Sequence, residues 1–161
     1  MEAKNKFSEL KETYKNIELH LTGPLQSNKV KVAASIFDVF HTLDREKIAR
    51  EFFKYSDEIT NKKFFIQVNT GEEVSKSGVY TKHLKEFLKF CQYDMNLNII
   101  GLMCIPPINE KATTHFKKLQ SLAVENNLYK LSIGMSSDYL EALDFNPTYI
   151  RLGTILFGKR A

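Results

Sequence analysis

Short apolar runs alternate with longer amphipathic stretches along the whole chain of 161 residues. The apolar runs are rich in Leu, Ile, Val and Phe and predict six strands, at residues 18–22, 37–41, 64–69, 97–105, 130–133 and 149–152. Between them apolar residues recur every three or four positions, which predicts helices at residues 7–14, 27–34, 44–55, 81–93, 111–126 and 138–143. Such strict alternation of helix and strand is typical of parallel βαβ units.

Two α/β architectures fit this alternation, and both remain open at this point. Several strands are almost wholly apolar, as expected when both faces of a parallel sheet are covered. A doubly wound sheet that binds a dinucleotide is disfavoured, because no G-x-G-x-x-G follows the first strand. A (β/α) barrel usually has eight strands and about 250 residues, so a barrel would require that some units are missing from this sequence.

Composition excludes several classes of protein. Hydrophobic residues make up 43% and charged residues 26%, which fits one globular domain over residues 1–161. The net charge of +4 is spread along the chain rather than gathered in a stripe, so we predict no nucleic-acid partner. There is no apolar run long enough for a membrane span and no apolar signal core near Met1, so we expect a soluble, cytoplasmic protein without a membrane partner.

The cysteines and histidines predict no metal site. Cys91 and Cys104 lack a C-x-x-C partner, and Cys104 lies in an apolar run that suggests a core residue. The histidines show no H-E-x-x-H spacing. His83 and His115 fall on what the pattern predicts to be helix surfaces.

Candidate ligand-binding residues follow the last two strands, where parallel α/β folds bind their ligands. Residues 134–138, Gly-Met-Ser-Ser-Asp, join a strand to a helix and offer two hydroxyls and free backbone N–H groups that suit a phosphate. Gly153 and Thr154 follow the final strand and add a close backbone approach and a third hydroxyl. The alternative is that the two serines and the aspartate only cap the helix.

Arg151 strengthens the case for a ligand site. It lies inside the last predicted strand, on the same face as Tyr149 and Gly153. A guanidinium there needs an acceptor, which is either a ligand or a buried carboxylate. His41 ends another predicted strand and is a candidate for the same pocket, with a purely structural histidine as the alternative. Lys76, in a polar loop, has the pattern of a solvated surface lysine.

Five segments resemble one known family. Residues 20–29, His-Leu-Thr-Gly-Pro-Leu-Gln-Ser-Asn-Lys, are similar to the signature of the pyridoxal phosphate homeostasis proteins, also called YggS-type or alanine-racemase-like proteins. The similarity continues through residues 69–78, 101–103, 134–138 and 151–158. It covers nearly the whole chain in the family's order.

The resemblance implies a (β/α)8 TIM-type barrel like the N-terminal domain of alanine racemase, bound pyridoxal 5′-phosphate, and no catalytic residue. By position, two serines, a glycine and a threonine would hold the phosphate, and an arginine would face the pyridine nitrogen. The predicted cofactor-binding residues are His41, Met135, Ser136, Ser137, Arg151, Gly153 and Thr154. Arginine stays protonated, so it can donate a hydrogen bond to the ring nitrogen but not a proton. A neutral pyridine is a poorer electron sink, which suits a carrier better than an enzyme.

The sequence departs from the family at its start. The family's Schiff-base lysine lies in an A-V-S-K-like segment on the first barrel strand, and a G-E-N-like motif ends the second. Neither segment is in this sequence. We therefore expect an incomplete barrel with about six of eight βα units, the product of a truncation or of a start site placed too far downstream. Open sheet edges should favour self-association, whereas the full-length form is expected to be a monomer. The cofactor would be held non-covalently unless Lys76 or Lys29 replaces the missing lysine.

Three functions remain open. The first is a non-catalytic carrier or buffer that maintains intracellular pyridoxal phosphate and supplies apo forms of enzymes that depend on it. The second is a racemase-like enzyme acting on amino acids, although racemases of this type draw a tyrosine from a second domain. The third is a truncated remnant that binds nothing tightly.

Overall fold

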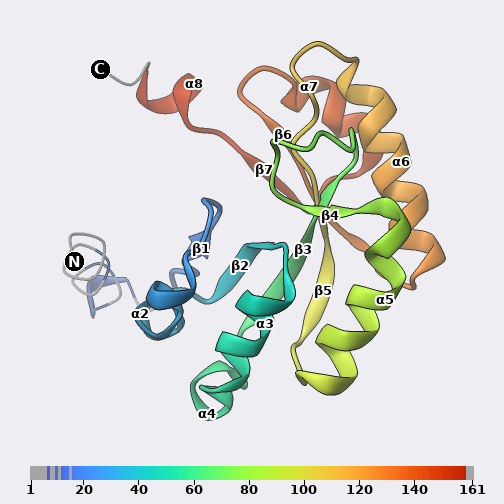
Figure 1. The fold of residues 1–161 in the computed structure, drawn as a ribbon. Helices are drawn as coiled ribbons and strands as arrows, with labels where there is room; N and C mark the ends of the chain where they lie inside the picture. The colour runs from blue at the N-terminus through green and yellow to red at the C-terminus, as the bar shows by residue number, and fades with distance from the viewer. Residues whose placement is uncertain (1–6, 8–9, 11, 15, 159–161) are drawn as a thin grey trace.

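Six parallel strands form one curled sheet in a computed structural model of the chain (Figure 1). The structure describes residues 7, 10, 12–14 and 16–158. The strands are β1 (His20–Leu21), β2 (Val39–Leu43), β3 (Lys63–Asn69), β5 (Ile99–Met103), β6 (Lys130–Met135) and β7 (Tyr149–Arg151). A two-residue strand, β4 (Val79–Tyr80), pairs with the end of β3 and was not predicted. The predicted strand at residues 37–41 lies two residues further along.

The order of the strands decides the architecture. The sheet runs β1-β2-β3-β5-β6-β7, and every pair is parallel. Each strand is therefore added on the same side as the one before, with no point where the order reverses. A doubly wound sheet requires such a reversal, so that alternative is wrong. The sheet is the curled, incomplete barrel that the sequence predicts. The right-handed crossovers that are the rule for parallel strands would place its helices on one face.

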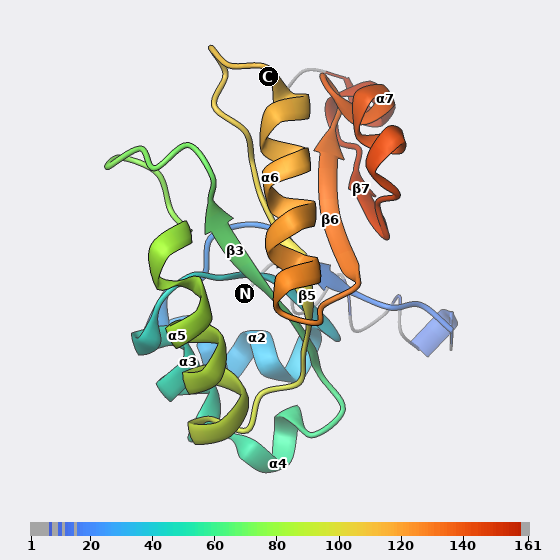
Figure 2. The same ribbon diagram turned by 90° about the vertical axis from the view of Figure 1, so that its right-hand side faces the viewer.

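The helices follow the strands in alternation, as predicted. They are α2 (Val30–Ile36), α3 (Glu46–Phe53), α4 (Ser56–Ile59), α5 (Leu84–Lys89), α6 (Ala112–Glu125), α7 (Tyr139–Ala142) and α8 (Thr154–Phe157). Short 3-10 turns precede α2 (η1, Ser27–Lys29) and α5 (η2, Thr81–His83) and follow α7 (η4, Leu143–Phe145), and a π-helical turn extends α5 (η3, Phe90–Asp94). Figure 2 shows α6 in front of β5. Of the predicted N-terminal helix at residues 7–14, residues 8, 9 and 11 lie outside the described residues, and residues 7, 10, 12 and 13 are helical. Within the part of the chain that the structure describes, every helix is too short or too polar to cross a lipid bilayer.

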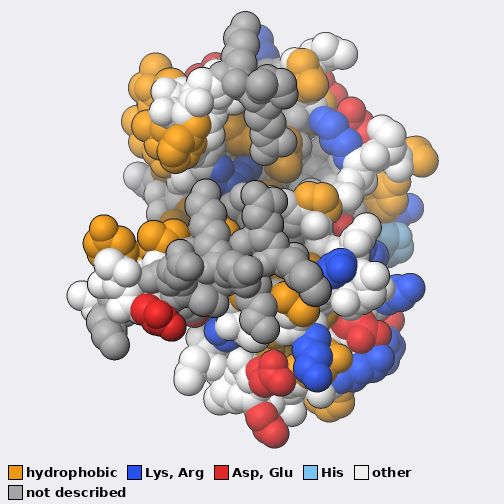
Figure 3. Space-filling model, turned by 90° about the vertical axis from the view of Figure 1, so that its left-hand side faces the viewer, with side chains coloured by type: hydrophobic (Ala, Val, Ile, Leu, Met, Phe, Trp, Pro, Cys, Tyr) orange, Lys and Arg blue, Asp and Glu red, His pale blue; other side chains and the backbone are white. Residues whose placement is uncertain are grey.

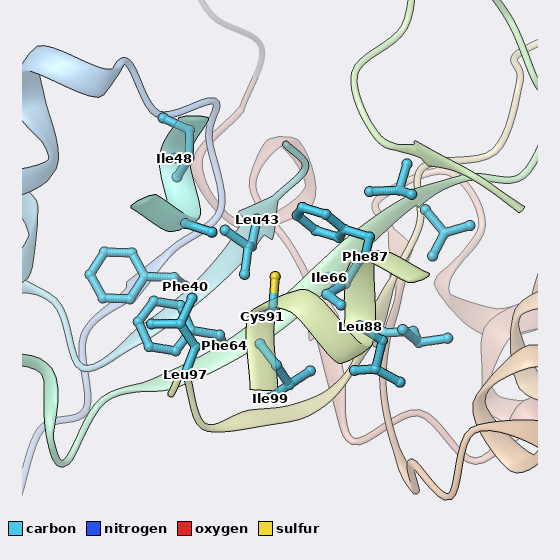
Figure 4. Packing of buried hydrophobic residues seen from close by; sticks show 14 of the residues in the cluster. Phe40, Leu43, Ile48, Phe64, Ile66, Phe87, Leu88, Cys91, Leu97 and Ile99 are labelled. Atoms are coloured by element: carbon cyan, nitrogen blue, oxygen red, sulfur yellow. The ribbon is translucent and has the colours of Figure 1, made fainter. Parts of the chain in front are cut away.

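The main hydrophobic core lies between the sheet and the helices (Figure 4). Its centre is a group of phenylalanines contributed by neighbouring strands and one helix. The rings of Phe40 and Phe64 stack with centroids 5.2 Å apart, and Phe52 of α3 meets both edge to face at 4.7 and 4.9 Å. Offset and edge-to-face pairs are the favoured aromatic geometries, and this cluster holds α3 on the sheet.

The opposite, concave face of the sheet holds a much smaller apolar cluster. Val39, Phe65 and Met103 are fully buried there, with Ile100 and Tyr149 packed against them. Phe65 and Phe64 are adjacent in β3, so the two clusters follow the alternation of side chains along one strand. Above this cluster the concave face becomes polar, and that is where the candidate site lies.

Candidate functional site

One cavity of about 930 Å³ opens at the carboxyl ends of β1, β6 and β7. All seven predicted cofactor-binding residues line it: His41, Met135, Ser136, Ser137, Arg151, Gly153 and Thr154. His20 and Tyr149, neither of which was predicted to bind the cofactor, also line it. Figure 3 views the molecule from the side of β1 and α8, where hydrophobic side chains gather at the upper end, the end at which α8 lies in Figure 1.

The turn after β6 directs its two serines toward the cavity. Gly134 has a φ of +87°, and a Cβ there would contact Ala142, so glycine is needed for the chain to turn. Asp138 accepts a hydrogen bond from the N–H of Met135 at 2.6 Å and does not cap α7. Ser136 Oγ accepts the N–H of Ile155 at 3.3 Å, which ties this turn to the segment after β7. The helix-capping alternative is therefore wrong.

Arg151 reaches from β7 across the end of β6. Its Nη1 donates to the backbone carbonyl of Ser132 at 2.7 Å and to the Ser132 hydroxyl at 2.8 Å. Its Nη2 donates to the carbonyl of Cys104 at 2.9 Å. No carboxylate among the described residues lies within ion-pairing distance, so the ion-pair alternative is wrong for this part of the chain. Burial lowers the pKa of Arg151 from its ordinary value.

The guanidinium retains donors for a ligand. It has five N–H bonds, and at least two, the Nε–H and one on Nη2, have no acceptor among the described residues. Because Arg151 lines the cavity and is removed from bulk water, an acceptor placed there would gain a charge-assisted hydrogen bond.

His41 is both a cavity residue and a hydrogen-bonded structural residue, so the two interpretations of it are compatible. Its Nδ1 lies 2.8 Å from Ser132 Oγ, and its Nε2 lies 2.9 Å from Nδ1 of His20. Its ring stacks on Phe65 at 4.7 Å. Burial, with the nearby charges of His20 and Arg151, lowers the pKa of His41 to about 3, so the imidazole is neutral at physiological pH.

His20 connects this buried network to the surface. Its Nε2 lies 3.0 Å from Glu18 Oε2, and Lys63 Nζ lies 2.6 Å from the other carboxylate oxygen. The hydrogen bond from Lys63 lowers the pKa of Glu18, which keeps the carboxylate ionised. The ring of His20 also meets Tyr149 of β7 at 4.8 Å, so side chains join the first and last strands. His20 lies in the middle of the predicted strand at residues 18–22, so the rule that ligands bind at the carboxyl ends of strands did not select it.

The two candidate substitute lysines lie away from this cavity. Lys76 Nζ is 2.8 Å from Glu73 Oε2 and 3.4 Å from the carbonyl of Pro106. It lines a neighbouring hollow of about 290 Å³, which shares Thr22 and Ile105 with the cavity. Lys29 is exposed on η1.

Two buried residues outside the cavity lining differ in how well they were predicted. Cys104 is fully buried, as predicted, and burial raises the pKa of its thiol to about 12, which makes it a poor nucleophile. His115 was predicted on a helix surface, and this is wrong. It is only 3% exposed, with Nδ1 3.0 Å from the hydroxyl of Thr70.

Comparison with known protein families places the chain among barrel domains. Residues 2–161 match the family described as "Alanine racemase, N-terminal domain". An alanine racemase of Clostridium difficile shares the fold, with a TM-score of 0.72 and 11% identity over 98% of this chain and 43% of that one.

More similar proteins carry a functional name. The chain is 36% identical over 156 residues to the "Pyridoxal phosphate homeostasis protein" of Aquifex aeolicus, covering 90% of this chain and 68% of the relative. The protein of the same name from Vibrio cholerae is 37% identical, with coverages of 89% and 65%. The solved structure of PipY from Synechococcus elongatus with PLP bound has a TM-score of 0.84 and 32% identity, over 98% of this chain and 77% of that one. The chain thus spans about two thirds of the length of these curated relatives.

Proposed function

Since the chain belongs to the pyridoxal phosphate homeostasis family, built on the alanine racemase N-terminal domain, we propose that it binds pyridoxal 5′-phosphate in the cavity around Arg151. We place it in the cytoplasm, as a carrier or buffer that supplies apo-enzymes rather than as an enzyme. Its relatives' shared name and the PLP-bound structure of PipY support this assignment.

The observation that carries the proposal is the presence of two chemistries in the lining of one cavity. Ser136, Ser137 and Thr154 offer hydroxyls at the mouth, where Gly153 leaves the backbone open. Arg151, which is only partly exposed, offers unpaired N–H donors to the same cavity. A phosphate monoester on an aromatic ring with one ring nitrogen fits this arrangement, because the hydroxyls suit the phosphate and the guanidinium suits a neutral nitrogen acceptor.

The residues around Arg151 favour a protein that holds the cofactor over one that transforms a substrate. When bound, pyridoxal phosphate supplies an electron sink for carbanions. Arg151 is a donor that cannot give up its proton, so it would keep the ring nitrogen neutral and that sink weak. His41 is neutral and engaged at both ring nitrogens, and the Cys104 thiol is protonated, so neither provides a ready base.

Titration with pyridoxal phosphate, followed by absorbance, tests the proposal. We expect saturable binding by the whole chain, and Arg151→Leu should weaken it by about ten- to a hundredfold, the loss of one or two charge-assisted hydrogen bonds. Ser137→Ala should weaken the binding of both pyridoxal phosphate and inorganic phosphate. Lys117→Ala, on the exposed face of α6, is the matched control and should change neither affinity.

Covalent attachment is tested in the same sample. After borohydride reduction, intact mass and peptide mapping should show no dominant lysine adduct, because Lys76 and Lys29 lie outside the cavity. A single adduct on either lysine would show that it replaces the family's anchor. Absence of saturable binding would refute the proposal, and turnover of an added amino acid would favour the racemase-like alternative.

A further inference from the structure

A continuous line of hydrogen bonds runs from the cavity to the surface behind Arg151. Its five members come from distant parts of the chain and are, in order, Arg151, Ser132, His41, His20 and Glu18. The successive separations are 2.8, 2.8, 2.9 and 3.0 Å. The middle of the line is fully buried, since Ser132 is 0% and His41 1% exposed.

The chemistry of the two ends fixes the direction of every bond. Arg151 can only donate, so Ser132 Oγ accepts from it and its own hydrogen is available for Nδ1 of His41. At the other end the ionised Glu18 can only accept, so His20 donates from Nε2. The buried Ser132 hydrogen has its acceptor at Nδ1 of His41, so the single ring proton of the neutral His41 is on Nε2 and is donated to Nδ1 of His20. This direction agrees with an arginine at one end and an ionised carboxylate at the other, and each hydrogen donated along the line has an acceptor.

We propose that Ser132, His41 and His20 are positioning residues, which hold the guanidinium of Arg151 in place for the ligand through this one-way line of hydrogen bonds ending at Glu18. The identity of the ligand rests on the function proposed above, whereas the line itself does not.

The surroundings restrain the line to this one arrangement. The Tyr149 ring covers both imidazoles, at 4.8 Å from His20 and 5.6 Å from His41, and Phe65 stacks beneath His41. The charged and titratable groups that face it are Lys63 beside Glu18, and Cys104 and Asp138 near Arg151. If His20 gained a proton, His41 would have to change tautomer and donate to Ser132. The Ser132 hydrogen would then lose its acceptor among the described residues. A proton on His20 would therefore break the line of hydrogen bonds at Ser132.

The tautomers can be measured without any ligand. Long-range ¹H–¹⁵N spectra of the whole chain at neutral pH should show His41 and His20 neutral, both protonated at Nε2. His41→Gln and His20→Gln spectra would assign the two signals. An Nδ1–H tautomer or a cationic ring at either residue would overturn the proposal.

Ligand binding then tests the positioning role. Glu18→Ala removes the terminal acceptor at a partly exposed site, whereas Glu18→Gln keeps an oxygen there, so we expect the alanine variant to lose pyridoxal phosphate affinity and the glutamine variant to recover it. Ser132→Ala breaks the line beside Arg151 and should weaken pyridoxal phosphate binding about tenfold, with inorganic phosphate binding unchanged. His115→Gln alters a buried histidine–hydroxyl pair outside the line and serves as the control.

The outcomes separate this proposal from the function it rests on. If the wild-type chain does not bind pyridoxal phosphate, the proposed function fails. The ¹H–¹⁵N spectra alone then test whether the line of hydrogen bonds exists. If it binds and Ser132→Ala binds equally well, or loses phosphate affinity in parallel, the positioning role is refuted.

Discussion

The two faces of the sheet are built from the same strands and differ in almost every other respect. Toward the helices, Phe40, Phe64 and Leu102 pack in a dry apolar core. On the concave side, the next residue along each strand is His41, Phe65 or Met103. The apolar cluster there is small, and a line of hydrogen bonds lies beside it. One face is stabilised by the apolar area that it removes from water, whereas the other depends on each polar group having a partner.

This contrast shows how one short domain can hold a buried arginine. Burying an unpaired charge is costly, so a cation on the concave face is tolerated only with nearby acceptors, which the carbonyls of Ser132 and Cys104 and the Ser132 hydroxyl provide. The phenylalanine core opposite can supply the stability, because its packing does not depend on the ligand. The two faces should therefore respond differently to substitution.

The largest effect should come from the helix-side core. Phe64→Ala removes a ring that is fully buried between Phe40 and Phe52, and we expect it to lower the free energy of unfolding by about 3–5 kcal/mol. Urea denaturation followed by circular dichroism measures this. A loss below about 1 kcal/mol would mean that this face is not where the stability lies.

A smaller loss of stability should follow from a substitution at Gly101, where the packing of the two faces meets. Gly101 lies where β5 approaches β6, and a Cβ there would overlap the carbonyl oxygen of Lys130 and the ring of Phe65. Gly101→Ala should cost about 1–3 kcal/mol of stability through this overpacking. Because Phe65 supports His41, the same variant should also weaken ligand binding. Unchanged binding would show that the faces are less coupled than their shared strands suggest.

The contribution of the concave face to the stability of the protein should be recognised by its dependence on pH. The pKa of His41 is lowered to about 3 in the folded protein, against about 6.5 in an unfolded chain. Between these values the unfolded chain binds a proton that the folded protein does not, so stability falls as the pH falls, by at most about 1.4 kcal/mol per pH unit. Above pH 6.5 this contribution to the slope vanishes.

Denaturant unfolding between pH 7 and pH 4 checks this slope, with His41→Gln as the comparison. The variant should be less stable at neutral pH and lose stability less steeply with acid. The His41 ring signal should also not titrate between pH 5 and pH 8, unlike histidine in a short peptide. Titration in that range would contradict a buried, neutral His41.

Much of the fold and the lining of the site follow from local patterns. The alternation of apolar runs predicts six strands at nearly the right places, and the rule that ligands bind at strand ends selects Ser136, Ser137 and Thr154. Alternation within the last strand puts Arg151 and Tyr149 on one face, and both line the cavity. Whether these residues hold a cofactor remains a prediction.

What could not be predicted depends on contacts between distant residues. Ser132 and His41 are far apart in the sequence, and no local pattern shows that one hydroxyl lies between an imidazole and a guanidinium. His115 could have been placed correctly, because it shares the buried stripe of α6 with Leu119 and Ala123. Its polar character outweighed its spacing, and the partner that allows its burial, Thr70, comes from another element.

The contact between His20 and Tyr149 has a consequence for how the chain folds. It joins the first strand to the last, so it closes a loop that contains almost the entire described sequence. Contacts between β2, β3 and β5 require only short loops, and the entropy of closing a loop grows with its length. We therefore expect the phenylalanine core to assemble in the folding transition state and the cavity to form after it. A newly made chain would pass through a stage in which its core is built but it cannot yet hold a ligand.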